Sequence, residues 1–243
     1  MREAESKLGT NLRVLEDLFR KQGVIPKDFT ELFSDSVHVV SARTQEYLLF
    51  KDPKNKLCPS TRALSEIFLM TYMARSVQLC MTDTLSCTIM TREQRILLGA
   101  DWVWAVVKGN SRNPRVQLTV HVFGQPIPEG GAANVLTEVY TETMETARME
   151  WPNKSKAKRM IDFCSSIAKD CYTLFLFFGH EGDIYGVLSN NFRAAPGKRT
   201  QIDRAFLWSF FKGSRYLFTP AGMLLSVVNK KQEESLTMLV KFS

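Results

Sequence analysis

The sequence has few of the residues from which metal and redox sites are built. It contains only 3 histidines. Its 5 cysteines, at positions 58, 80, 87, 164 and 171, never form the Cys-x-x-Cys pair of a zinc or redox site. No histidine lies near a cysteine pair in the sequence. We therefore expect reduced core thiols in a protein that needs no metal and no other cofactor.

Long apolar runs and targeting segments are also missing. No apolar run reaches the roughly 20 residues that a membrane-spanning helix needs, and the start, Met1-Arg2-Glu3-Ala4-Glu5, is unlike a signal peptide. Only 13 of the 243 residues are glycine and 9 are proline, whereas 44% are hydrophobic. We expect a single globular domain over 1–243, soluble or at most peripheral. The net charge of +7 favours anionic partners.

Catalytic signatures are absent as well. Gly197-Lys198-Arg199-Thr200 suggests a phosphate-binding loop, but the lysine is not followed by serine or threonine and no glycine precedes it at the required distance. Cys58, Cys164 or Cys171 could approach His180 in space as a nucleophile pair, but no local pattern supports this. We expect that the protein is not an enzyme.

The most distinctive segment, Gly99-Ala100-Asp101-Trp102-Val103-Trp104, places a carboxylate next to two of the 4 tryptophans. Thr91 and Gln94 have the spacing of a capping box, and Gly109 is a plausible end, so the pattern predicts a buried helix of roughly four turns. A buried Asp101 needs a partner. A structural hydrogen bond is the simpler interpretation, and a partner-facing or catalytic acid is the alternative.

Hydrophobic spacing predicts the remaining helices. Apolar residues recur every three or four positions over 10–22, from Pro26 to about Lys51, from Thr61 to about Leu79, and over 156–170. The helix from Thr61 is apolar around most of its circumference, including Met70 and Met73, so we expect it inside the protein. The segment from Cys80 to Met90 is interpreted as a linker.

Alternating patterns predict strands in the second half of the chain. The alternation from Arg115 indicates a half-buried strand with His121 on its solvent face. Segments 172–178 and 184–189 predict a β-hairpin whose first strand is buried on both faces. Further strands are predicted at 215–218, 223–228 and 236–242, whereas 134–150 fit either element. The class is therefore α+β, with an N-terminal helical part (about 10–109) packed on a C-terminal, mostly antiparallel sheet (about 115–243).

Several short segments keep a specific order and spacing: Glu46–Phe50, Lys56–Pro59, Glu66–Leu69, Met90–Thr91, Leu98–Trp104, Phe163–Cys164 and Asp170–Cys171. In combination they resemble the Rab-fifteen effector protein family. The resemblance covers 37–123 and 151–190 well, whereas 124–150 departs from it. Most matching positions are expected to be buried, so they indicate the fold rather than an interface.

The resemblance implies a non-enzymatic effector that binds GTP-loaded Rab GTPases. It also implies a cytoplasmic protein that lies peripherally on early or recycling endosomes and regulates the return of receptors, such as the transferrin receptor, to the cell surface. Family members carry glycine after the first methionine, which suits myristoylation. This chain begins Met1-Arg2 and departs from that pattern.

Two segments could form the Rab-binding surface, which needs apolar anchors within a polar rim. One is the stripe Val37, Val40 and Tyr47, for which inward packing is the preferred alternative. The other is an aromatic helix at 201–211 that either caps the sheet or is exposed for a partner. Its candidate contact residues are Phe206, Leu207, Trp208, Phe210 and Phe211.

A basic cluster supplies an alternative function. Its residues, at the start of the helix over 156–170, are Lys154, Lys156, Lys158 and Arg159. Together with Lys198, Arg199 and Arg204, this cluster could bind an anionic membrane or nucleic acid. Charged runs are usually solvated, so we expect at most a weak contact with anionic membranes and no nucleic-acid partner.

Overall fold

The computed structural model describes residues 29–54, 56–107, 114–123, 156–167, 170–179, 182–192, 216–230 and 236–243. The helices are α2 (Phe29–Leu48), α3 (Thr61–Gln78), α4 (Arg92–Leu98), α6 (Lys156–Ile167) and α8 (Pro220–Asn229). The strands are β1 (Leu85–Ile89), β2 (Trp102–Val107), β3 (Pro114–Phe123), β4 (Cys171–Phe178), β5 (Ile184–Ser189) and β6 (Thr237–Lys241). The predicted α+β class is confirmed.

The strands form one sheet in sequence order, β1-β2-β3-β4-β5-β6. Four of its neighbouring pairs are antiparallel and only β3 and β4 run parallel, so the sheet is mostly antiparallel as predicted. A parallel pair needs a long crossover connection, and α6 belongs to the one between β3 and β4. Strands β1 and β2 lie in the range that the sequence assigned to helices.

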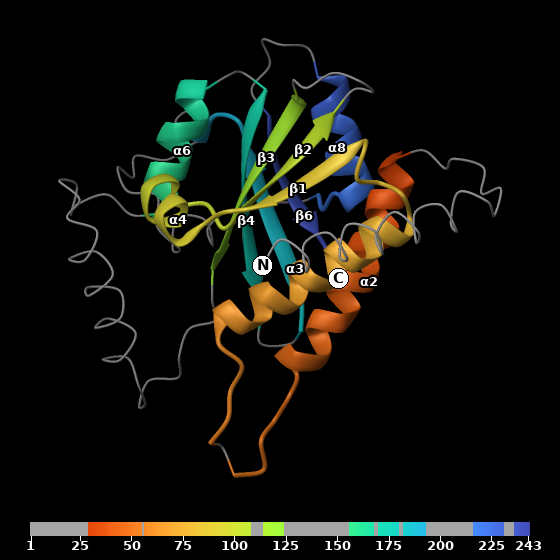
Figure 1. Cartoon of the computed structure of the whole chain (residues 1–243), viewed down its shortest axis with the longest axis vertical. Coiled ribbons are helices and arrows are strands. Elements are labelled where there is room, and N and C mark those ends of the chain that lie inside the picture. Colours follow the sequence, from red (N-terminus) through yellow and green to blue (C-terminus); the bar gives the residue numbers. More distant parts are fainter. Residues whose placement is uncertain are drawn as a thin grey trace, which may run out of the picture.

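Helices cover both faces of the sheet (Figure 1). Apolar residues of α2, α3 and α8 share one buried cluster with the sheet, and residues of α6 share a second cluster to which Leu98 of α4 adds. Strand β4 lies between the two layers and is buried along its whole length, as predicted. The α2–α3 hairpin therefore belongs to the outermost layer on its side of the sheet.

The tryptophan segment is a strand, which corrects the predicted helix. Trp102 and Trp104 alternate with half-buried residues along β2, and both have no exposed surface. Successive side chains of a strand point to opposite faces, so the two indoles lie on the same face, whereas a helix would have separated them. They pack against aromatic rings of α2 and α3, with Phe68 stacked on Trp102 at 5.7 Å between ring centroids.

A short helix precedes this strand. The predicted capping box is confirmed: Thr91 Oγ1 accepts a hydrogen bond from Gln94 N–H, and Gln94 Oε1 accepts one from Thr91 N–H. The helix ends at Gly99 and not at Gly109, which lies outside the described residues. Gly99 has φ 72°, a left-handed conformation that favours glycine and stops a helix.

The other predicted elements have mixed outcomes. Helices α2, α3 and α6, strands β3 and β6, and the β4–β5 hairpin are confirmed. The predicted strand at 223–228 is helix α8, because Thr219 caps it and Pro220 occupies its first turn. The predicted linker between Cys80 and Met90 contains β1. Within 216–218, the described part of the strand predicted at 215–218, only Phe218 forms a bridge, to Val240.

Three predicted segments fall outside the described residues, namely the helices at 10–22 and 201–211 and the ambiguous segment 134–150, as do the basic residues Lys198, Arg199 and Arg204. Among the described helices, none combines the length and apolar character that a membrane span requires.

Candidate interaction surface

Inward packing, the preferred interpretation of the stripe on α2, is confirmed for Val37 and Val40, and the alternative that they contact a partner is not. Val37 and Val40 have no exposed surface and belong to the core beneath the helix, so they cannot contact a partner in this conformation. Tyr47 is half-buried: its hydroxyl accepts a hydrogen bond from Arg43 Nη2 at 3.0 Å, and the Arg43 guanidinium lies 5.1 Å from the ring centroid. The other candidates, Phe206, Leu207, Trp208, Phe210 and Phe211, lie outside the described residues.

Three apolar side chains of the α2–α3 hairpin are exposed rather than buried. Val39 of α2 is exposed, as are Met70 and Met73 of α3, with 63% and 42% of their surface accessible. We call these three residues the outer face. On α3, Met70 lies about 200° around the helix from the buried Phe68, because each residue turns the helix by about 100°. The prediction that Met70 and Met73 are buried was therefore wrong.

Ion pairs lie one helical turn from the outer face. Val39 lies between Asp35 and Arg43 on α2 at spacings of four residues, which place them on one side of the helix. Asp35 pairs with Arg75 of α3 at 2.6 Å, and Arg43 pairs with Glu46. On α3, Glu66 precedes Met70 by four residues and pairs with Arg62 at 2.9 Å. An apolar centre within a polar rim is the usual arrangement of a protein–protein contact.

The sequence contained one signal that could have located the outer face. The buried stripe of α3 is fixed by Leu64, Phe68 and Tyr72, which are four residues apart. A second apolar set on α3, here Met70 and Met73, lies at other angles around the helix and is not needed for packing on the sheet, which indicates another use.

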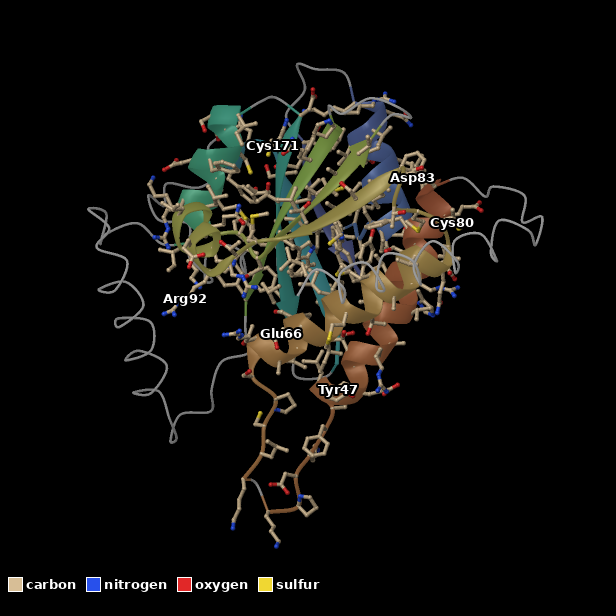
Figure 2. The ribbon with its side chains drawn as sticks, viewed as in Figure 1. Tyr47, Glu66, Cys80, Asp83, Arg92 and Cys171 are labelled. Atoms are coloured by element: carbon tan, nitrogen blue, oxygen red, sulfur yellow. The ribbon has the colours of Figure 1, made fainter. Side chains whose placement is uncertain are left out.

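Figure 2 shows Glu66 on this helix, one turn before Met70 in the sequence, and Arg92 on the α4 side of the molecule.

The basic cluster is not the exposed patch that the sequence predicted. Arg159 is 6% exposed, Lys156 and Lys158 are half-buried, and Lys154 lies outside the described residues. Burial lowers the pKa of Lys156, and the charges of Arg159 and Arg95 lower it further, although Asp101 acts in the opposite direction. The described part of the cluster is therefore packed against the rest of the protein.

Asp101 has the structural role that the sequence favoured. Its Oδ2 accepts a hydrogen bond from Val122 N–H at 2.8 Å and lies 2.9 Å from Nδ1 of His121. Its backbone C=O accepts a hydrogen bond from Met90 N–H, and its backbone N–H donates one to the C=O of Val120. The residue thus joins the ends of three strands. His121 is buried at 7% exposure, which corrects its predicted place on a solvent face.

Electrostatics keep Asp101 ionised. Burial raises the pKa of its carboxyl group, but the hydrogen bond and charge of His121, the Val122 N–H and the charge of Lys156 together hold it below the ordinary value. The stabilisation that follows is fully present above the unfolded-state pKa of about 3.9. It is lost as the pH falls through the lower folded-state pKa.

We expect Asp101→Ala to lower the free energy of unfolding at neutral pH by about 2–3 kcal/mol, because His121 and Val122 N–H lose a charged partner. Urea unfolding measured between neutral pH and about pH 3 tests this. The difference from the parent protein should shrink as the solution becomes acidic. A difference that is constant with pH would contradict the assigned ion pair. Asp83→Ala, which removes an exposed carboxylate elsewhere on the surface, controls for general acid effects.

The buried cysteines form a packed group with a threonine. Thr119 Oγ1 lies 3.3 Å from Cys164 Sγ and 3.5 Å from Cys171 Sγ, and all three side chains are buried. The interaction between the two thiols, together with burial, raises the pKa of Cys164, and the same interaction lowers the pKa of Cys171. The described residues contain no group of three side chains that could hold a metal ion. His180 lies outside them, so a cysteine–histidine pair is not tested.

A family model and a related mouse protein, both described as Rab15 effector, match this chain. A family model described as Rab15 effector matches residues 21–240, which extend from before α2 into β6. The mouse Rab15 effector protein is 29% identical to this chain over 181 residues. The matched region covers 71% of this chain and 75% of the mouse protein.

Proposed function

The chain belongs to the Rab15 effector family, and we propose that it binds a Rab GTPase in the GTP-bound state through the outer face of the α2–α3 hairpin. Rab15 is the first candidate, because the family and the mouse relative are named for it. A Rab effector is a binding protein and not a class of enzyme. The observation that carries the choice of surface is the exposure of three apolar side chains on these two helices, Val39, Met70 and Met73.

The packing beneath the outer face suits recognition of a GTPase switch. GTP orders the switch segments of a small GTPase and hydrolysis releases them, so an effector must offer a surface that fits only the ordered form. Helices α2 and α3 are held by the aromatic core of the sheet, and the Asp35–Arg75 ion pair joins them at the surface. Methionine side chains on such a rigid support adapt to a partner at low energetic cost.

Replacing both Met70 and Met73 with serine is expected to weaken binding to GTP-loaded Rab15 at least tenfold, because truncating central apolar contacts costs about 2 kcal/mol or more. Isothermal titration calorimetry with the full chain measures the effect. The variant should keep the thermal stability of the parent, since both side chains are exposed.

A matched control removes two exposed apolar residues from the other side of the sheet. Leu97→Ser and Ile167→Ser lie on α4 and α6, and both side chains are exposed to a similar degree as the methionines. This double variant should bind like the parent protein. If the methionine variant bound Rab15 with unchanged affinity, the interface would not lie on the outer face. The pair Phe206→Ala and Trp208→Ala, measured in the same assay, tests the aromatic segment predicted from the sequence.

We further propose that this binding brings the protein to early or recycling endosomes, where it regulates receptor recycling. Family membership and the resemblance of the sequence segments support this proposal. In cells, the Met70→Ser, Met73→Ser variant should leave endosomes that carry the Rab, whereas the Leu97→Ser, Ile167→Ser control should remain. The return of the transferrin receptor to the cell surface is measured with both variants expressed at the same level. It should slow only with the methionine variant.

A further inference from the structure

The connection between α2 and α3 projects away from the sheet, at the bottom of Figure 1. It comprises residues 49–54 and 56–60, which we call the hairpin loop. Phe50 and Leu57 lie in it with 46% and 65% of their surface exposed. Two segments that carry the family resemblance, Glu46–Phe50 and Lys56–Pro59, end or begin here.

The hairpin loop has a net positive charge, with three lysines and one aspartate. Lys51, Lys54 and Lys56 are all exposed. Its one acidic residue, Asp52, faces the loop backbone: its carboxylate accepts hydrogen bonds from the N–H groups of Lys54 at 3.1 Å, Lys56 at 2.6 Å and Leu57 at 2.9 Å. The bonds from Lys54 and Lys56 are the main reason that the pKa of Asp52 lies below its ordinary value. The loop thus has a defined shape and presents lysines outward.

Exposed aromatic and aliphatic side chains next to several lysines suit a lipid surface better than a protein surface. Apolar side chains enter the headgroup region of a bilayer while lysines remain with anionic lipid headgroups. Protein interfaces, by contrast, are depleted in lysine. The loop stands at one end of the α2–α3 hairpin, whereas the outer face lies along its helices, so the two surfaces involve different residues (Figures 1 and 2).

We propose that the hairpin loop docks on anionic lipid bilayers, with Phe50 and Leu57 inserting at the interface and Lys51, Lys54 and Lys56 contacting the headgroups. Charge complementarity is the argument for this partner, because the loop presents three exposed lysines and its single carboxylate, that of Asp52, accepts hydrogen bonds from the loop backbone. The proposal does not depend on Rab binding. It can therefore be tested in a mixture that contains no Rab.

The test is cosedimentation of the full chain with phosphatidylcholine vesicles, with and without added phosphatidylserine. We expect binding only when phosphatidylserine is present, and we expect it to weaken as salt is added. The variant Phe50→Ser, Leu57→Ser should lose about tenfold or more of the partition coefficient, because two large apolar side chains no longer enter the bilayer. The outer-face variant Met70→Ser, Met73→Ser has lost exposed apolar surface elsewhere and should bind vesicles normally.

A charge variant tests the lysines separately. Changing Lys51, Lys54 and Lys56 to glutamine should weaken vesicle binding about fivefold for each lysine removed. The control changes three exposed arginines outside the loop, Arg62, Arg92 and Arg115, to glutamine. It alters the net charge by the same amount and should affect binding much less. Equal losses in the two variants would show a general effect of charge and would overturn the assignment to the loop.

A fluorescent label reports the depth of the loop directly. Cys58 and Cys80 are the exposed cysteines of the chain. In a Cys80→Ser background, an environment-sensitive dye on Cys58 should shift to shorter wavelength when phosphatidylserine vesicles are added. An unshifted dye, or vesicle binding that is unchanged in the Phe50→Ser, Leu57→Ser variant, would overturn the proposal. If that variant bound vesicles normally but lost Rab binding, the loop would be a protein contact instead.

Discussion

Trp104→Ala is expected to lower the free energy of unfolding by about 4 kcal/mol, because it removes the largest kind of side chain from a fully buried position. The indole of Trp104 contacts rings from both outer helices and from its own strand. The ring centroids of Tyr72, Phe33 and Trp102 lie 5.2, 5.4 and 5.6 Å from it. Its loss would leave a cavity between β2 and the α2–α3 hairpin.

Urea unfolding followed by circular dichroism measures this effect. Tyr216→Ala is the matched control, because it also truncates an aromatic residue but one that is 78% exposed, and it should change stability by no more than about 0.5 kcal/mol. Since Trp104 supports the helices of the outer face, we also expect Trp104→Ala to weaken Rab binding. A loss of less than about 1 kcal/mol would contradict the packing described for β2.

Gly99→Ala should also destabilise the protein strongly, by about 3 kcal/mol, for two reasons that add. The φ angle of 72° is unfavourable for any residue with a Cβ atom. A Cβ atom here would also lie 2.1 Å from the backbone oxygen of Lys156, the first residue of α6. A backbone atom cannot rotate away as a side chain can, so α4 and α6 would have to separate.

Gly222→Ala supplies the control for this substitution. Gly222 lies in the first turn of α8, where the nearest neighbour of an added Cβ would be Thr219 Oγ1 at 3.3 Å. Alanine favours the helix, so the two effects should leave stability within about 0.5 kcal/mol of the parent. Thermal unfolding compares the two variants. If Gly99→Ala were as stable as Gly222→Ala, the close contact between α4 and α6 would be wrong.

Periodicity was sufficient to predict most of the fold. The helices α2 and α3 follow from apolar residues every three or four positions, and β3 from strict alternation. It failed at the tryptophan segment, because a short apolar run fits a buried helix and a buried strand equally well. Gly99 was the signal that decides between them: it ends α4 in a left-handed conformation, and the residues after it, rich in valine and tryptophan, favour a strand.

The candidate surface was harder to predict than the fold. The sequence offered the stripe with Val37 and Val40 as one possible partner surface but preferred inward packing, since a regular stripe is the same pattern for a core and for an interface. Val39 and Met70 belong to no regular apolar stripe. Their exposure can be recognised only when the buried side of each helix is known. Contacts between distant elements, such as Asp101 with His121, leave no local signal in the sequence.

The central claim is that this chain distinguishes the nucleotide state of a Rab. Its most direct test is the affinity of the full chain for Rab15 loaded with a non-hydrolysable GTP analogue, compared with Rab15 loaded with GDP. Coupling between nucleotide and effector binding is typically 1–3 kcal/mol, so we expect the GTP form to bind at least about tenfold more tightly. Equal affinity for the two forms would contradict the proposed function, because only a difference in affinity can report the state of the switch.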